Sequence, residues 1–329
     1  PAAAVTTSTI APTTSSTTSP TTTTTLPDRT DIMRAVGANE AGRIMVLEYH
    51  LIEEPEGDYA RTPENFRRDI ERLIAGGYYP ITVRDLATGH IDVPAGKTPV
   101  VLTFDDSSSG QCRFLTDGTP DPQSACGMLV AAAERHPDDW APIATFNVLL
   151  DVDVDDRVLF GQPNIVREKL NTMVGWGMEI GSHTISHFNL SLGTPEQLQW
   201  QLGTPETVLE ELIEDYEVDT LATPFGVYPE DEELLVAGEW EGEPYDYIAV
   251  LEVSGGPSVS PHRAGFDPVH ITRIVAVDAD VDYWFAYYDA NPGERYVSDG
   301  DPMTIAVPDT AEFDPGELIE GQRIVRYAP

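Results

Sequence analysis

The sequence predicts an α/β fold in which parallel strands and helices close into a barrel, followed by a short C-terminal β extension. Short apolar runs alternate with helical patterns between about residues 44 and 277. Strands that alternate with helices pair in parallel through crossover connections. No glycine-rich turn of the dinucleotide-binding or P-loop kind follows any early strand, so a barrel fits this pattern better than an open sheet.

The first part of the chain differs in composition from the rest. Residues 1–27 are almost entirely Thr, Ser, Pro and Ala, and no charged residue precedes Asp28. Such a stretch has too few apolar residues for a core, so we predict that residues 1–40 form a disordered tether. Stalks of this composition lift domains off cell surfaces, and the chain starts at Pro1. We therefore expect an extracellular or cell-surface protein, exported by an upstream signal peptide or anchor.

Eight apolar runs are the strand candidates in the predicted main domain, residues 41–290. Several of the helices between them begin with Thr-Pro-Glu, at Thr62, Thr194 and Thr204. This tripeptide supplies a capping hydroxyl, a proline at the first helical position and an acid that the helix dipole favours. Residues 291–329 lack helical periodicity and form the predicted β extension. The strand candidates are residues 44–48, 79–83, 99–104, 143–149, 179–182, 220–222, 247–251 and 270–277.

The charge balance excludes some classes of partner. The chain carries 56 acidic and 19 basic residues, a net charge of -37. Such a surface repels nucleic acid and anionic lipid, and it is typical of proteins adapted to salt, which screens the self-repulsion. No apolar run approaches the roughly 18 residues of a membrane span, so we expect no membrane insertion. The oligomeric state is left open by the sequence.

The two cysteines, Cys112 and Cys126, have two interpretations. In an exported protein they can form a disulfide that closes a loop of about 15 residues and contributes around 3 kcal/mol. The alternative is a pair of free thiols. Their spacing fits no common structural zinc motif.

The apolar run at residues 99–104 ends abruptly in two adjacent acids, Asp105 and Asp106. In parallel α/β folds the carboxyl ends of strands carry the chemistry, so this is a functional position. Taken alone, the pair has an ordinary alternative as a helix N-cap with a neighbouring turn acid.

A second strand end favours the functional interpretation of Asp105 and Asp106 over the helix N-cap. The stretch EIGSHTISHFNL, residues 179–190, presents His183 and His187 four residues apart. If this segment is helical, both imidazoles lie on one face about 6 Å apart, within reach of one metal ion. Two histidines and one carboxylate make an open three-ligand site, which leaves the second carboxylate to act as a general base.

These motifs resemble those of a known family. TFDD and SHTISH are similar to the first two motifs of the polysaccharide deacetylases, the carbohydrate esterase family 4 with the NodB homology domain. The resemblance covers roughly residues 44–277 and implies a distorted (β/α) barrel that hydrolyses acetyl groups from a sugar polymer with a metal. It also implies that Asp105 is the general base and that Asp106, His183 and His187 are the metal ligands.

Other stretches resemble one branch of the family. VLEYHLI, TPENFRRDIERLIAGGYYPITVRDL and ATPFG are similar to segments of deacetylases that act on poly-β-1,6-N-acetylglucosamine. This resemblance implies that His50 is the general acid, with His262 and His270 as competing candidates. It also makes the backbone N–H of Phe225 a candidate oxyanion donor.

The sequence departs from the family at two places. Ala222 stands where much of the family has an arginine that pairs with the base, and Arg273 is the candidate for the missing charge, unless it forms a surface salt bridge. Ser107 stands where the family has glycine. The serine run from Ser107 to Ser109 lacks the Gly-x-Ser-x-Gly elbow of serine hydrolases, so we expect no nucleophilic serine.

We therefore predict a metal-dependent hydrolase that removes acetyl groups, in particular N-acetyl groups, from a cell-surface or extracellular polysaccharide. Zn²⁺ is the expected metal, although the same ligands suit Co²⁺ or Ni²⁺. An O-acetyl xylan or peptidoglycan esterase, and a non-catalytic glycan-binding protein on the same fold, remain alternatives. Three aromatic residues are candidates for stacking on sugar rings or for the core: Trp176, Trp200 and Tyr228.

Overall fold

The barrel predicted from the sequence is confirmed by a computed structural model, which describes residues 28–329. Seven strands pair in parallel in the order β1, β12, β11, β8, β7, β6, β5, and β5 pairs back with β1 to close the ring. Each of the eight strand candidates corresponds to one observed strand. These strands are β1 (Met45–Tyr49), β4 (Tyr78–Ile81), β5 (Thr98–Phe104), β6 (Thr145–Val148), β7 (Glu179–Ser182), β8 (Thr220–Ala222), β11 (Ala249–Gly255) and β12 (Ile271–Val275).

The eighth strand, β4, explains why the barrel is distorted. It pairs with residues 98–101 of β5, whereas β6 pairs with residues 103–104 and β1 with residues 100–104. Because a strand has only two edges, β4 and β6 share one edge of β5, one behind the other. The barrel wall is therefore continuous at the carboxyl end of β5, where the two acids follow.

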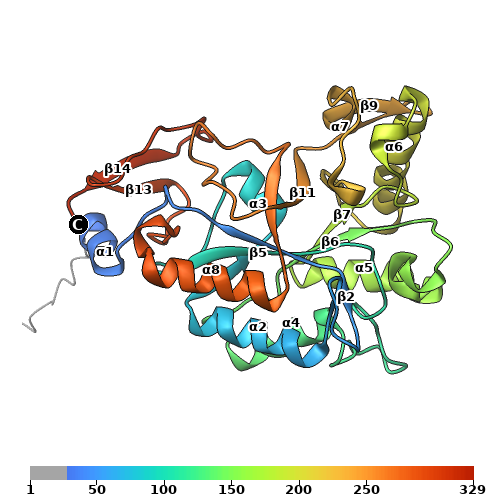
Figure 1. The fold of residues 1–329 in the computed structure, drawn as a ribbon, viewed down its shortest axis with the longest axis horizontal. Helices are drawn as coiled ribbons and strands as arrows, with labels where there is room; N and C mark the ends of the chain where they lie inside the picture. Colours follow the sequence, from blue (N-terminus) through green and yellow to red (C-terminus); the bar gives the residue numbers. More distant parts are fainter. Residues whose placement is uncertain (1–27) are drawn as a thin grey trace, which may run out of the picture.

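Helices cover the outside of the barrel (Figure 1). In α2, the apolar side chains of Phe66, Ile70 and Leu73 are buried against the strands. Thr62 and Thr194 cap α2 and α6 as expected, since each hydroxyl accepts an N–H of the first turn. These helices are α2 (Pro63–Ala75), α3 (Val83–Thr88), α4 (Ala125–Arg135), α5 (Val166–Gly175), α6 (Pro195–Leu212), α7 (Glu233–Val236) and α8 (Asp278–Ala290).

The helix start predicted at Thr204 is wrong. Thr204 and Pro205 lie inside the continuous helix α6, which runs to Leu212. A proline inside a helix removes one backbone hydrogen bond. Here burial of one face of the helix, with Leu202 and Leu209 in the core, outweighs that local preference.

Alternate residues of the barrel strands point to opposite sides, as the period of a strand requires. Met45, Leu47 and Tyr49 of β1 pack outward in the core beneath the helices, whereas Val46 packs in a second, inner core. Glu48 shares the inward register of Val46. Because of this alternation, polar side chains from several strands point into the barrel near the carboxyl ends of the strands.

Shorter elements lie at the two ends of the molecule. At one end, α1 (Arg29–Val36) lies beside β13 (Thr304–Pro308) and β14 (Arg323–Tyr327), which pair in parallel (Figure 1). At the other end, α6 lies against the hairpin of β9 (Ala237–Trp240) and β10 (Glu243–Asp246). A two-residue pair, β2 (Leu51–Ile52) and β3 (Ala60–Arg61), follows β1.

The boundary of the tether needs correction. Most of it, residues 1–27, lies outside the described residues. Residues 29–36, which we included in it, instead form α1, and Met33 and Ala38 are buried with Tyr327 of β14. Helix α1 has only 8 residues, too few for a helical repeat of apolar residues to be recognised in the sequence.

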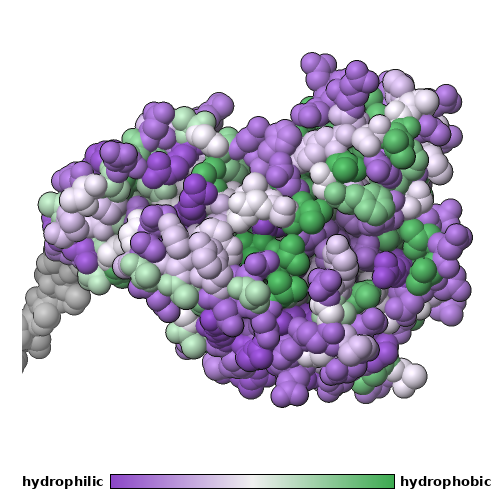
Figure 2. Space-filling model, in the orientation of Figure 1, coloured by the Kyte–Doolittle hydropathy of each residue, from purple (hydrophilic) through white to green (hydrophobic). Residues whose placement is uncertain are grey.

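The surface agrees with the composition. The face drawn in Figure 2 is largely hydrophilic, with a group of hydrophobic residues near its middle. Between residues 28 and 329, no helix has the length and apolar character needed to cross a bilayer.

Candidate active site

The predicted site residues meet at the carboxyl ends of the barrel strands, around a pocket of about 430 Å³. Asp105 and Asp106 follow β5, His183 follows β7 and His50 follows β1. Phe225 reaches the pocket from the 3-10 turn η5 (Pro224–Gly226) after β8. The full lining is His50, Leu51, Tyr59, Asp105, Asp106, Arg157, His183, His187, Thr223, Phe225 and Val253.

Asp105 continues the inward register of β5 and is buried in a polar environment. Arg273 donates to both of its oxygens, at 3.0 Å to Oδ1 and 2.7 Å to Oδ2, and Asn147 donates to Oδ1 at 2.8 Å. Burial alone would raise the pKa of Asp105, but the charge and hydrogen bonds of Arg273 hold it well below its usual range. Asp105 is thus an ionised carboxylate with fixed geometry.

This ion pair supplies the positive charge that the chain lacks at Ala222, where much of the family has an arginine. Arg273 comes from β12, is fully buried and also lies 3.2 Å from Glu48 Oε1. The structure therefore places a guanidinium beside Asp105, rather than in a surface salt bridge.

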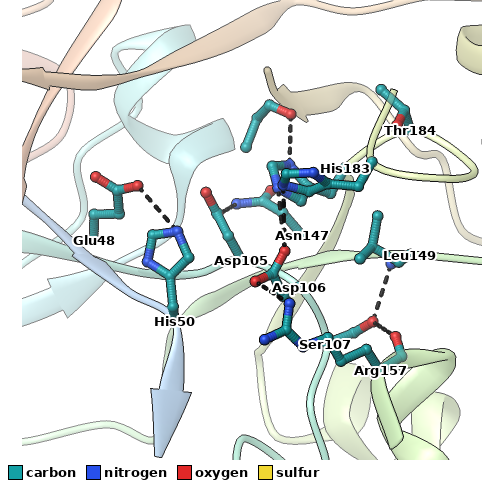
Figure 3. Close-up of polar contacts among 12 residues, drawn as sticks. Glu48, His50, Asp105, Asp106, Ser107, Asn147, Leu149, Arg157, His183 and Thr184 are labelled. Atoms are coloured by element: carbon teal, nitrogen blue, oxygen red, sulfur yellow. Dashed lines mark hydrogen bonds and ion pairs between the residues drawn. The ribbon is translucent and has the colours of Figure 1, made fainter. Parts of the chain in front are cut away.

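Asp106 faces the two histidines. Its backbone has φ 76°, in the left-handed region, which turns the side chain away from the direction of Asp105. Asp106 Oδ1 lies 3.7 Å from His183 Nε2 (Figure 3). It also lies 3.5 Å from His187 Nε2. The two imidazole rings are 5.0 Å apart between centroids.

The helical geometry considered for His183 and His187 is wrong. The segment between them is a turn in which Thr184 and His187 have φ values of 66° and 55°. The Thr184 hydroxyl accepts the N–H of Phe188 and stabilises this turn. Two left-handed residues thus bring the rings together, in place of the i, i+4 spacing of a helix.

The tautomer of His183 suits coordination. Its Nδ1 lies 2.7 Å from the carbonyl oxygen of Ala222, so Nδ1–H donates there and the lone pair of Nε2 faces Asp106. Burial lowers the pKa of both histidines, which favours the neutral form that binds a metal.

Two clusters in residues 28–329 bring three ligand atoms within 4.8 Å of one another. One contains Asp106, His183 and His187, and the other contains Glu48, His50 and Asp105. In the second cluster the guanidinium of Arg273 already supplies a cation to both carboxylates. In the first, Asp106 Oδ1 is buried and accepts no hydrogen bond from any described residue. The first cluster, which offers two imidazoles and this free oxygen, therefore fits a metal ion better than the second, which offers one imidazole beside a buried guanidinium.

His50 lies at the pocket opposite the histidine pair. Its Nε2 is 3.6 Å from Glu48 Oε1, and its carbonyl accepts a hydrogen bond from the Gln111 side chain. Burial lowers the pKa of His50. Neither competitor lines this pocket: His262 packs near Tyr296, and His270 stacks on Tyr228 and contacts Glu252.

Phe225 is an exposed aromatic residue at the pocket mouth. Its side chain is 61% exposed, and its ring packs edge-on against His187 at 4.4 Å. On the other side, Tyr59 is 65% exposed and packs edge-on against His50. The three aromatic residues considered for sugar stacking, Trp176, Trp200 and Tyr228, do not line the pocket.

Sequence reasoning missed Tyr59, Arg157 and Glu48. Tyr59 lies in the short loop between β2 and β3, and Arg157 ends the 3-10 turn η1 (Asp155–Arg157), so neither belongs to a periodic pattern. The sequence did contain a signal for Glu48. This residue lies two positions before His50 inside an apolar strand, and a buried charge there needs a partner.

The loop between β5 and α4, which follows the two acids, contacts the site. Cys112 and Cys126 form a disulfide. The neighbouring Gln111 side chain donates to the carbonyls of both His50 and Asp105. The disulfide-bonded loop therefore holds the ends of β1 and β5 together.

Comparisons with known proteins agree with this site. Residues 141–237 match the family model described as Polysaccharide deacetylase. The chain carries a polysaccharide deacetylase domain. The match agrees with the family and the enzyme class predicted from the sequence, and its range contains both histidines of the candidate metal site.

Proteins similar to this chain align over most of its length. The protein YxkH of Bacillus subtilis (strain 168), named for polysaccharide deacetylase, is 21% identical over 73% of this chain and 74% of its own. The structure of BC0361, a polysaccharide deacetylase from Bacillus cereus, aligns with a TM-score of 0.55 and 20% identity, over 74% of this chain and 68% of that one. IcaB from Ammonifex degensii aligns with a TM-score of 0.53 and 18% identity, over 75% and 97%. These structural likenesses establish the shared fold.

Proposed function

We propose that this polysaccharide deacetylase is a metal-dependent hydrolase that removes N-acetyl groups from a cell-surface or extracellular polysaccharide. The observation that supports the metal is the buried, unpaired Oδ1 of Asp106, which faces Nε2 of both His183 and His187. Two imidazoles and one carboxylate with an open side are the ligand set of catalytic zinc sites. Zn²⁺ is the proposed metal, and Co²⁺ or Ni²⁺ suits the same ligands.

When bound, the metal supplies Lewis acidity to a water molecule and to the acetyl carbonyl. Asp105 takes the proton of the attacking water, because its carboxylate is held ionised and in one orientation by Arg273 and Asn147. The N–H of Phe225 donates to the developing oxyanion, and a donor of this kind contributes about 3 to 4 kcal/mol. His50, on the opposite side of the pocket, gives a proton to the departing amine.

Glycan binding and location complete the proposal. The exposed rings of Tyr59 and Phe225 flank the pocket and offer faces on which sugar rings stack. The disulfide supports an oxidising location outside the cytoplasm. Similarity of VLEYHLI and ATPFG to poly-N-acetylglucosamine deacetylases suggests that polymer as the first substrate to test.

The test is acetate release from a panel of acetylated glycans, with and without a chelator. The panel contains poly-N-acetylglucosamine and chitin oligomers, acetylated xylan and peptidoglycan. We expect release from an N-acetylated polymer that stops with chelator and returns with Zn²⁺. Release from xylan alone would assign an O-acetyl esterase. Binding without release would assign a glycan-binding protein, and release that resists chelation would refute the metal.

A further inference from the structure

Arg157 and Ser107 surround Asp106 on the side away from the histidines. Arg157 Nη1 donates to Asp106 Oδ2 at 3.2 Å, which leaves Oδ1 to face the two Nε2 atoms (Figure 3). The Arg157 side chain is 35% exposed and lines the pocket. One oxygen of the carboxylate is therefore fixed by the protein, and the other is free.

Ser107 fixes the loop that carries Arg157. Its hydroxyl donates to the Arg157 carbonyl at 2.6 Å and accepts the N–H of Leu149 at 3.0 Å. Its own carbonyl accepts the N–H of Phe160. These bonds join the end of β5 to both ends of the loop that contains η1.

The backbone at this place is strained. Asp106 and Ser107 both have positive φ, 76° and 45°, although neither is glycine. Each such residue costs on the order of 1 kcal/mol or more, and the surrounding structure must compensate. Glycine would relieve the strain at position 107 but would lose both hydrogen bonds of the hydroxyl. Serine at this position therefore costs backbone strain but connects the end of β5 to Arg157 through hydrogen bonds.

We propose that Ser107 and Arg157 are positioning residues that orient Asp106 for its metal ion. The inference rests on the proposed metal site and adds a second layer to it. Ser107 anchors the loop, the loop presents Arg157, and Arg157 holds the carboxylate of Asp106. Partners of this kind outside the ligand shell typically change metal affinity about 10- to 100-fold.

A purely electrostatic role makes the opposite prediction. A guanidinium 3.2 Å from a metal ligand repels the cation, so removing its charge would tighten metal binding. The orienting role predicts weaker binding, because Asp106 loses its fixed rotamer. The sign of the change in affinity therefore separates the two.

The experiment measures Zn²⁺ affinity by isothermal titration calorimetry on the metal-free, full-length protein. Arg157→Ala and Arg157→Met should each weaken binding about 10- to 100-fold. Arg157→Lys keeps an N–H donor and should restore most of the affinity. Ser107→Ala, which has the same backbone restriction, should weaken binding in the same direction. Arg135→Ala, at an exposed ion pair with Glu71, is the control for loss of one positive charge.

The outcomes separate this inference from the proposed function. If the parent protein binds no Zn²⁺, the proposed metal site fails, and this inference fails with it. If the parent binds Zn²⁺ and Asp106→Ala abolishes binding, unchanged or tighter binding by Arg157→Ala overturns the positioning role alone. Melting temperatures of the metal-free variants, expected to match the parent for the position 157 changes, exclude a loss of fold as the cause.

Discussion

Asp105 and Asp106 are neighbours in the chain, but their carboxylates have different partners. Asp105 keeps the inward register of β5 and meets Arg273, whereas the positive φ of Asp106 turns it towards the histidines. An acid held by a guanidinium and an acid with a free oxygen suit the roles of base and ligand. One change of backbone direction therefore divides the two tasks.

Asn substitutions should separate these tasks. Asp105→Asn should lower kcat by about 10²- to 10⁴-fold, the usual contribution of a general base, and should leave Zn²⁺ affinity near that of the parent. Asp106→Asn should weaken Zn²⁺ binding itself. Steady-state acetate release and calorimetry check both. Loss of metal in the Asp105 variant would mean that the two roles are reversed.

His50 has a similarly distinct test. His50→Gln should lower kcat by about 10²- to 10⁴-fold while the metal stays bound, because only the proton donor is removed. His262→Gln and His270→Gln serve as matched controls outside the pocket and should stay close to the parent in kcat. Near-normal turnover by His50→Gln would show that His50 is not the general acid, and a fall in kcat for His262→Gln or His270→Gln would assign that role to the residue replaced.

At the residue scale, the sequence predicted those groups that stand at strand ends. Asp105, Asp106, His183 and His50 follow apolar runs, and the end of a parallel strand is a place of known meaning. Arg157 and Tyr59 lie in loops with no period, so only the folded chain brings them to the pocket. The pairing of Arg273 with Asp105 joins residues 168 positions apart, which no local pattern encodes.

At the element scale, strands were more predictable than the turns between them. The strands of the barrel are buried on both faces, so their apolar runs stand out in the sequence. The turn at Thr184 and the interior Pro205 of α6 depend on contacts made after folding. Local preference pointed to a helix in the first case and to a helix start in the second, and tertiary packing overrode both.

The disulfide gives a prediction for one loop. Replacing Cys112 and Cys126 together by serine should lower the free energy of unfolding by about 3 kcal/mol, because the open loop gains entropy in the unfolded chain. The kcat should also fall, since Gln111 beside Cys112 holds the ends of β1 and β5. Denaturant unfolding and acetate release check these effects. Dithiothreitol should reproduce them in the parent and add nothing in the variant, and an unchanged stability would contradict the prediction.

At the scale of the whole molecule, Glu40 connects the barrel to the extension. Its carboxylate accepts the N–H groups of Asp299 and of Ala306 in β13, and its own carbonyl accepts the hydroxyl of Ser260. Burial, together with the nearby charge of Asp299, raises the pKa of Glu40 to about 8. The contact is thus a buried acid that is protonated in the folded protein at mildly acidic pH.

This raised pKa makes stability depend on pH. Between the ordinary value of 4.5 and about 8, the folded state holds the proton of Glu40 more tightly than the unfolded state. The contribution is therefore complete below about 4.5 and is lost as the pH rises through about 8. The expected loss is on the order of a few kcal/mol.

Comparison with Glu40→Gln isolates this contribution. Urea unfolding of both proteins at several pH values from 5 to about 8.5 should show a steeper decline in the parent, because the glutamine cannot titrate. Groups far from Glu40 titrate alike in the two proteins, so their contribution cancels in the comparison. Parallel pH profiles would show that Glu40 keeps an ordinary pKa.

The pairing of β1 with β5 makes the first strand of the barrel part of the candidate active site. The segment that matches the family, residues 141–237, supplies the histidines but neither the two acids nor His50 and Arg273. Those groups come from the outlying portions of the chain, which meet only when the ring of strands closes. A shortened gene that encodes only residues 141–237 would therefore yield the two histidines without the carboxylates that they face.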